Sequence, residues 1–145
     1  MGDFEKEIKS SFPNNKVKAL LNILYTANWI NSYQNTFFKP YGISPQQYNI
    51  LRILRGAKKP LKVQVIKERM IERAPNATRL MDKLCEKKLI DRIASSQDRR
   101  VVNIVITTKG LDLLQEIGNN FNTKLLKNIT EDEAIKLNQL LDKFR

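Results

Sequence analysis

Residues 73–110, RAPNATRLMDKLCEKKLIDRIASSQDRRVVNIVITTKG, carry the pattern that decides the fold. Apolar residues recur at three- and four-residue spacing over Ala77–Cys85, which predicts a helix with one apolar face. Two β-branched runs follow, Leu89–Ile93 and Val101–Ile106, and a polar turn over 94–100 separates them. These runs predict a β-hairpin. A helix followed by a basic hairpin is the plan of a winged helix-turn-helix unit that binds DNA.

The residues before this stretch supply the other helices of such a unit. Ser44 is a predicted N-cap, with Pro45 at the first helical position and a glutamine three residues after the cap, the pattern of a capping box. The pattern predicts a helix over Pro45–Arg55. A turn over 56–60 then separates it from a short helix over Val63–Ile71. Two helices joined by a short turn and followed by a third have helix-turn-helix spacing.

Longer apolar patterns lie on both sides of this unit. A helical pattern runs over 15–38 before it, and Thr107 is the predicted N-cap of another helix after it. A second capping box at Thr130 opens the last helix, whose apolar residues extend to Phe144. Too little chain follows these C-terminal helices to cover them. We therefore expect them to form a dimer interface together with the first long helix.

The predicted fold is mainly α with a small β-hairpin wing. We expect a single domain over 1–145, in which residues 44–109 form a winged helix-turn-helix DNA-binding lobe. Residues 1–40 and 110–145 are expected to supply dimerisation helices. No apolar run approaches the roughly 18 residues of a membrane span. A single cysteine excludes an intramolecular disulfide and fits a reducing cytoplasm.

The charge of the chain is unevenly distributed. The net charge is +11, and residues 52–109 alone carry sixteen Lys/Arg and six Asp/Glu, a net charge of +10. Double-stranded DNA is the polyanionic partner that this segment predicts. Histidine is absent and no Gly-rich phosphate loop is found. The sequence therefore offers neither the commonest general base nor a structural zinc site, and we expect no enzyme activity, metal or cofactor.

The outward face of the predicted recognition helix carries side chains that suit DNA contact. Pro75 is expected in its first turn, where the missing N–H costs nothing. Asn, Thr and Arg hydrogen-bond base edges and phosphates, although on a helix without a partner the same side chains would simply be solvated. The basic surroundings favour the first interpretation. The predicted DNA-binding residues are Arg55, Lys62, Pro75, Asn76, Thr78, Arg79, Lys83, Asp98, Arg99 and Arg100, with Arg52, Lys58 and Lys59 along the phosphate backbone.

An aromatic column lies in the first long helix, where Tyr25, Trp29 and Tyr33 are four residues apart. Core packing is the simpler interpretation, and the wall of a small-molecule pocket is the functional one. The candidate pocket residues are Tyr25, Trp29, Tyr33, Phe38 and Tyr48. Cys85 falls on the apolar arc of its helix, which favours a core cysteine over an exposed redox switch.

Three segments resemble the MarR family of bacterial transcription regulators. They are GISPQQYNIL at 42–51, TRLMDKL at 78–84, and DRR at 98–100 followed by IVITTKG at 104–110. The last combination matches the family's wing signature of Asp-x-Arg, a strand, a threonine and a later glycine. The resemblance implies an obligate homodimer whose two winged lobes grip a pseudo-palindromic DNA site.

The resemblance also implies roles for single residues. Arg100 would enter the minor groove from the wing while Asp98 holds it, and a narrow A·T-rich groove attracts such an arginine. A pocket between the dimer base and the DNA lobes would bind phenolic or other amphipathic acids. One departure is Lys88, where many members have a glycine after the recognition helix. Either that helix ends differently, or Lys88 adopts a strained left-handed conformation.

These observations predict a ligand-responsive repressor that binds DNA as a homodimer and responds to a small amphipathic aromatic effector. One alternative is a transcriptional activator, or an anti-silencing DNA-binding protein without an effector. Another is a helical interaction module without DNA, which would show no steep salt dependence of DNA binding.

Overall fold

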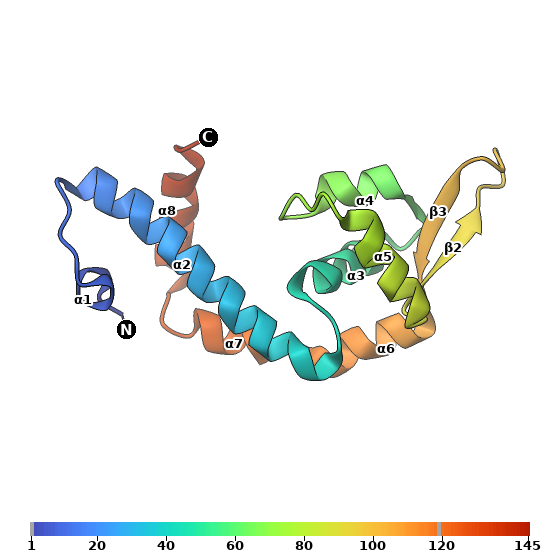
Figure 1. Ribbon diagram of the computed structural model, residues 1–145, viewed down its shortest axis with the longest axis horizontal. Coiled ribbons are helices and arrows are strands. Elements are labelled where there is room, and N and C mark those ends of the chain that lie inside the picture. The colour runs from blue at the N-terminus through green and yellow to red at the C-terminus, as the bar shows by residue number, and fades with distance from the viewer. Residues whose placement is uncertain (1, 119) are drawn as a thin grey trace. The chain divides into compact units, whose positions relative to one another are not determined.

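The computed structural model describes residues 2–118 and 120–145, and it is mainly helical with one small antiparallel sheet (Figure 1). The residues fall into two compact units. The first unit is Met1–Tyr33 with Asn119–Arg145, and the second unit is Gln34–Gly118. The elements in order are α1 Phe4–Ile8, α2 Asn15–Phe38, the 3₁₀ turn η1 Lys39–Tyr41, α3 Pro45–Ala57, β1 Leu61–Lys62, α4 Val63–Arg69, α5 Ala77–Glu86, β2 Ile90–Ala94, β3 Val102–Ile106, α6 Thr108–Ile117, α7 Asn120–Leu126 and α8 Glu131–Asp142.

The second unit is a winged helix-turn-helix, so the predicted fold of helices with a hairpin wing is confirmed. Strands β2 and β3 form the predicted hairpin, in which Ile90 pairs with Ile106. The short strand β1 adds a third member, in the order β1-β3-β2, because Leu61 pairs with Ile104. The fully buried side chains of this unit come from all its helices and from the sheet. The largest of them are Phe38, Ile50, Leu51, Leu54, Ile66, Met81, Leu84, Ile90, Ile104, Leu114 and Ile117.

Helix α3 begins with the predicted capping box. The Gln47 N–H donates to the Ser44 hydroxyl at 3.1 Å, and the Gln47 side chain accepts from the Ser44 N–H at 2.9 Å. Gln47 is itself buried, and its amide also donates to the Leu80 carbonyl of α5 at 3.3 Å. One residue thus caps α3 and ties that helix to α5, which leaves no buried polar atom of Gln47 unpaired.

Several predicted element boundaries shift in the structure. Helix α3 continues to Ala57, and the left-handed Lys58 ends it. Helix α4 stops at Arg69, and Pro75 lies in a turn before α5, not in the first helical turn. These ends depend on contacts with other elements, which local sequence signals do not report.

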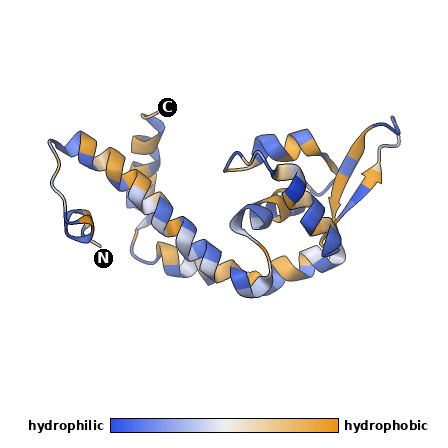
Figure 2. Ribbon diagram, viewed as in Figure 1, coloured by the Kyte–Doolittle hydropathy of each residue, from blue (hydrophilic) through white to orange (hydrophobic). Residues whose placement is uncertain are grey.

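The first unit has little core of its own among the described residues. Phe4 of α1 is buried, stacking on Phe12 at 5.1 Å and lying 5.4 Å from the Tyr25 ring of α2. Helix α8 begins with the predicted capping box at Thr130, but it buries no residue. Large apolar side chains are instead exposed along α2 and towards the C-terminus, and Figure 2 shows this apolar colouring on α2 and α8. They are Leu20, Leu21, Leu24, Trp29, Leu126, Ile135, Leu137, Leu140 and Phe144.

None of the helices over residues 2–118 and 120–145 combines the length and hydrophobicity that a membrane span needs.

Candidate nucleic-acid interface

Helix α5 presents one buried and one exposed face, as its sequence predicts. Ala77, Met81 and Leu84 are buried in the second unit. Thr78, Arg79, Asp82, Lys83 and Glu86 are exposed. Asn76 takes the N-cap position, and its side chain makes no capping hydrogen bond. The side chains predicted to contact DNA from this helix therefore point to solvent, where a groove can receive them.

The turn between α4 and α5 is tied to α3. The Ile71 N–H donates to Asn49 Oδ1 at 3.0 Å, and Gln46 Nε2 donates to Glu72 Oε2 at 3.0 Å. The Ala77 N–H donates to the Ala74 carbonyl at 3.1 Å, which closes a turn around Pro75. Helix α3 therefore holds the first part of the connection, at Ile71 and Glu72, and a separate backbone bond closes the turn from which α5 begins. None of these tying residues was predicted, since their contacts join segments more than twenty residues apart.

Helix α5 ends in a left-handed residue at Lys88, one of the two alternatives that the sequence left open. Lys88 adopts the left-handed conformation with φ 61°. Its N–H donates to the Cys85 carbonyl at 2.9 Å, and the Leu89 N–H donates to the Leu84 carbonyl at 3.0 Å. These two bonds, together with buried Leu84 and Leu89, make a Schellman motif with a lysine at the position that usually holds glycine. The helix end is therefore preserved, and the backbone of Lys88 bears the strain.

Residues at the start of α6 brace this strained connection. The Thr107 hydroxyl donates to the Lys88 carbonyl at 2.7 Å, and the Thr107 N–H donates to the Leu89 carbonyl at 3.1 Å. Lys109 Nζ donates to the Lys87 carbonyl at 3.0 Å. The carbonyls of three successive residues between α5 and β2, 87–89, thus accept hydrogen bonds from Thr107 and Lys109. A structural role for the basic side chain of Lys109 was not predicted from sequence.

Gly110 is required by the same close approach. A Cβ atom at this position would lie 2.4 Å from the Leu89 carbonyl oxygen and 2.7 Å from a side-chain carbon of Ile106. The Gly110 N–H also donates to the Thr107 hydroxyl at 3.0 Å, which caps α6 as predicted. The threonine and glycine of the wing signature therefore act together. Thr107 hydrogen-bonds the connection between α5 and β2, and Gly110, which has no Cβ, lets that connection pass close to α6.

Asp82 on α5 and Arg92 on β2 form an ion pair. Both side chains are about half exposed, so the pair contributes little to stability by itself. Its effect is geometric, since it joins the recognition helix directly to the wing. The pair was not predicted, because nothing local to either residue indicates its partner ten positions away.

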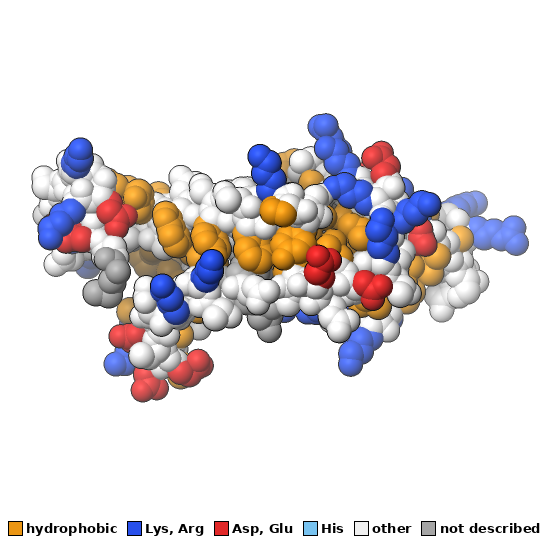
Figure 3. All heavy atoms as spheres, turned by 90° about the horizontal axis from the view of Figure 1, so that it is seen from below, with side chains coloured by type: hydrophobic (Ala, Val, Ile, Leu, Met, Phe, Trp, Pro, Cys, Tyr) orange, Lys and Arg blue, Asp and Glu red, His pale blue; other side chains and the backbone are white. Residues whose placement is uncertain are grey.

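The wing carries the predicted arginines at its exposed tip. Asp98 Oδ1 accepts from the Arg100 N–H at 2.9 Å, and the Val101 N–H donates to the Asp98 carbonyl at 3.0 Å. Asp98 therefore fixes the backbone that carries Arg100, while the side chains of Arg99 and Arg100 are exposed. Figure 3 shows Lys and Arg side chains projecting at this end, on the right.

The remaining basic candidates belong to the same unit. Arg55 on α3 and Lys62 on β1 are exposed. The second unit carries seventeen Lys/Arg and eight Asp/Glu, a net charge of +9, against nine and seven in the first unit. A surface of this charge attracts a polyanion at long range before any specific contact forms.

The five candidate pocket residues do not share one environment. Trp29 stacks on Tyr33 with ring centroids 6.0 Å apart, and Tyr25 lies against Phe4. Phe38 and Tyr48 are buried against each other, with centroids 4.5 Å apart. A cavity of about 290 Å³ in the first unit is lined by Tyr25 and Trp29 but by none of the other three.

Cys85 is half-buried, and burial raises the pKa of its thiol more than the nearby Arg92 lowers it. A raised pKa disfavours the reactive thiolate, in agreement with a structural cysteine. Among the described residues, no three His, Cys, Asp or Glu side chains cluster as metal ligands.

Comparison with known proteins identifies this arrangement. The model of the MarR family matches residues 43–102. The transcriptional regulator MhqR of Bacillus subtilis is 35% identical over 89 residues, 61% of this chain and 60% of MhqR. The multiple antibiotic resistance protein MarR of Escherichia coli is 28% identical over 113 residues, 75% of this chain and 78% of that protein. A mutant of E. coli MarR complexed with operator DNA superposes with a TM-score of 0.76 at 25% identity, over 92% of this chain and 99% of that chain.

The chain belongs to the MarR family. Membership confirms the resemblance and assigns the chain to the DNA-binding transcription regulators. The relatives named above are regulators and not enzymes. In MarR terms, α5 is the recognition helix and the β2–β3 hairpin is the wing. The contacts assigned above to single DNA-binding residues remain predictions.

Proposed function

We propose that this MarR-family chain is a homodimeric repressor that binds a pseudo-palindromic operator and releases it when a small amphipathic effector binds. The observation that carries the proposal is the exposure of Thr78, Arg79 and Lys83 on α5 and of Arg99 and Arg100 at the wing tip, all on a unit of net charge +9. Arg79 and Lys83 lie one helical turn apart, so both can reach the same groove.

The first unit supports the homodimer. Its nine exposed large apolar side chains, all among the described residues, lie on α2, near the end of α7 and towards the C-terminus. On α2, Leu20, Leu21 and Leu24 share one flank, whereas Tyr25 and Trp29 lie on another at 100° per residue. Figure 3 shows apolar side chains gathered at the surface of the face that it draws. A second copy of the chain that covered the leucine flank and α8 would remove an aggregation-prone surface.

Repression and effector control are the finer parts of the proposal. One relative with 34% identity, MdtR of B. subtilis, is a transcriptional repressor, and the structural neighbour in complex with operator DNA is a MarR protein. An effector releases DNA only if it binds the DNA-incompetent arrangement more tightly than the competent one. Because its partner is DNA, we place the protein in the cytoplasm.

Selection of bound DNA from a random pool tests the proposal. A homodimeric winged helix predicts an enriched palindrome whose half-sites lie about one helical turn apart. Affinity for that site should fall linearly with salt concentration on logarithmic axes, with a slope set by the number of phosphate contacts. Enrichment of a single half-site would refute dimeric binding, and absence of any enriched sequence would refute sequence-specific regulation.

A further inference from the structure

A cavity of about 290 Å³ lies within the first unit, between the N-terminal residues and the aromatic flank of α2. It is lined by Gly2, Glu7, Tyr25, Thr26 and Trp29. Its volume is at the lower end of the range for small-molecule sites, which is roughly 300–1,000 Å³. Among the described residues that line it, Glu7 has the one charged side chain, and none is basic. The cavity therefore has two aromatic walls and a carboxylate.

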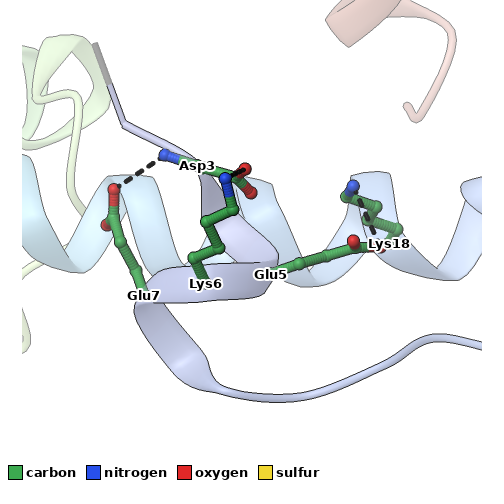
Figure 4. Close-up of polar contacts among 5 residues, drawn as sticks. All are labelled: Asp3, Glu5, Lys6, Glu7 and Lys18. Atoms are coloured by element: carbon green, nitrogen blue, oxygen red, sulfur yellow. Dashed lines mark hydrogen bonds and ion pairs between the residues drawn. The ribbon is translucent and has the colours of Figure 1, made fainter.

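The N-terminal residues that close this cavity are anchored to α2. Glu5 pairs with Lys18 of α2 at 3.1 Å (Figure 4). The Phe4 ring packs against Tyr25, with ring centroids 5.4 Å apart. The Asp3 N–H donates to Glu7 Oε1 at 3.1 Å, which places the Glu7 carboxylate (Figure 4). The wall that carries Glu7 is thus held both by an apolar contact and by an ion pair.

Tyr25 and Glu7 are hydrogen-bonded to each other in the cavity. The hydrogen bond from Tyr25 to Glu7, followed by burial and the charge of Glu7, raises the pKa of Tyr25. Tyr25 therefore stays neutral and serves as a hydrogen-bond donor to the Glu7 side chain. Trp29 stacks on Tyr33 with the planes 20° apart, which holds its indole in one orientation. Its side chain is 53% exposed, so the indole can be reached from solvent.

We propose that this cavity binds a small organic cation, a quaternary or protonated amine with an apolar substituent. Glu7 supplies the countercharge, and the faces of Tyr25 and Trp29 supply cation–π attraction. An aromatic acid of the same size would meet the Glu7 carboxylate and be repelled. The cavity thus selects the charge opposite to that of the acids that the family resemblance implied. That such a cation is the effector, and not merely a ligand, rests on the proposed function.

Calorimetric titration of the full-length protein with two matched probes tests the site. Benzyltrimethylammonium and benzoate carry one ring each and opposite charges. We expect saturable binding of the cation, with a change in the fluorescence of Trp29, the sole tryptophan, and at least about tenfold weaker binding of benzoate. Equal affinity for the two probes, or no saturable binding of the cation, would overturn the proposal.

Variants separate the roles of charge and ring. Glu7→Gln keeps an acceptor for the Asp3 N–H but removes the charge, so it should weaken cation binding about tenfold. Asp132→Asn makes the same change in net charge at an exposed position of the first unit outside the cavity, and should have no effect. Trp29→Leu removes one aromatic wall without touching Glu7, and should also weaken binding. Unchanged cation affinity in Glu7→Gln would refute the site.

Operator affinity measured in parallel keeps the two proposals distinguishable. Tight operator binding by a protein that ignores the cation would refute the cavity alone. Cation binding by a protein that selects no DNA sequence would refute the regulatory proposal alone.

Discussion

The second unit buries its apolar side chains and exposes its positive charge, whereas the first unit does nearly the reverse. Among the described residues, every buried apolar side chain except Phe4 lies in the second unit. Nine of the thirteen exposed large apolar side chains lie in the first unit. The net charges are +9 and +2. The second unit therefore has an apolar core of its own, and the first unit exposes the apolar surface that the proposed dimer would cover.

The strongest test of this difference is to make the first unit's surface polar. The pair Leu24→Asp and Leu140→Asp places charges on two exposed apolar positions of α2 and α8. We expect a dimer of the 16.9 kDa chain to dissociate to monomers in sedimentation experiments. Operator affinity should fall by about a hundredfold or more, because two half-sites can no longer be engaged together.

Ile71→Asp is the matched control for oligomeric state. Ile71 is 91% exposed but belongs to the second unit, so the same chemical change there should leave the dimer intact. If both proteins remained dimeric, the exposed apolar surface of the first unit would not be the interface.

Removal of single arginines tests whether the positive charge of the second unit, and not that of the first, binds DNA. Arg79→Ala on α5 and Arg100→Ala on the wing should each weaken operator binding by about 1–3 kcal/mol and relax specificity at one base position. Arg145→Ala removes the same charge from the first unit, where Arg145 pairs with Asp142 at 2.6 Å, and should change operator affinity little. Fluorescence anisotropy on operator and random DNA gives both affinities. Equal losses on the two DNAs would make Arg79 and Arg100 phosphate contacts and not base contacts.

The elements that sequence analysis predicted well have strong local signals. The bounds of α2 and the capping boxes at Ser44 and Thr130 follow from residues within four positions of one another. The exposed face of α5 follows from helical periodicity in the same way. The site could be predicted only to this level, because periodicity states which side chains point outward and not what they bind.

The parts that sequence analysis missed depend on contacts between distant residues. The connection after α4 is held at Ile71 and Glu72 by Asn49 and Gln46 of α3, so the course of the chain before α5 could not be read from its own residues. The brace from Thr107 to Lys88 spans nineteen residues. Local signals allowed either a different helix end or a left-handed Lys88. The structure has the left-handed Lys88, and α6 packs against the connection at that residue.

Alanine substitutions at two glycines of the second unit test how closely α6 packs against the connection between α5 and β2. Gly110→Ala would place a methyl group against the Leu89 carbonyl, and we expect it to destabilise the protein by about 1–3 kcal/mol. Gly56→Ala is the control, because nothing lies within 4 Å of its added Cβ and alanine favours the helix. It should stabilise the protein by about 0.5–1 kcal/mol. Denaturant unfolding measures both, and equal effects would show that α6 does not closely approach the connection.

Lys88 tests whether the second unit bears backbone strain at the end of its recognition helix. Lys88→Gly should raise the free energy of unfolding by about 0.5–1 kcal/mol, because glycine adopts φ 61° without the steric cost of a side chain. Lys88→Ala keeps the Cβ atom and should change stability little. Equal stability of the Gly and Ala variants would show that the brace from α6 removes the cost of the left-handed conformation.

The smallest expected effect distinguishes the capping boxes of the two units. The box of α3 uses the uncharged Gln47, whereas the box of α8 uses Glu133, whose pKa is lowered by hydrogen bonds from the Thr130 backbone and then from its side chain. A carboxylate with a lowered folded pKa adds stability above its unfolded pKa, and loses that contribution as the pH falls through the folded value.

Glu133→Gln should therefore be less stable than the wild type at about pH 7, and the difference should shrink towards about pH 3. Asp132→Asn, which changes the net charge equally in the same helical turn, controls for general electrostatics. Denaturation midpoints over this pH range give the comparison. A difference between wild type and Glu133→Gln that stayed constant with pH would mean that the capping bond of α8 does not depend on the charge of Glu133. The contribution of the α8 cap to stability would then be independent of pH, as is expected for the uncharged cap of α3 at Gln47.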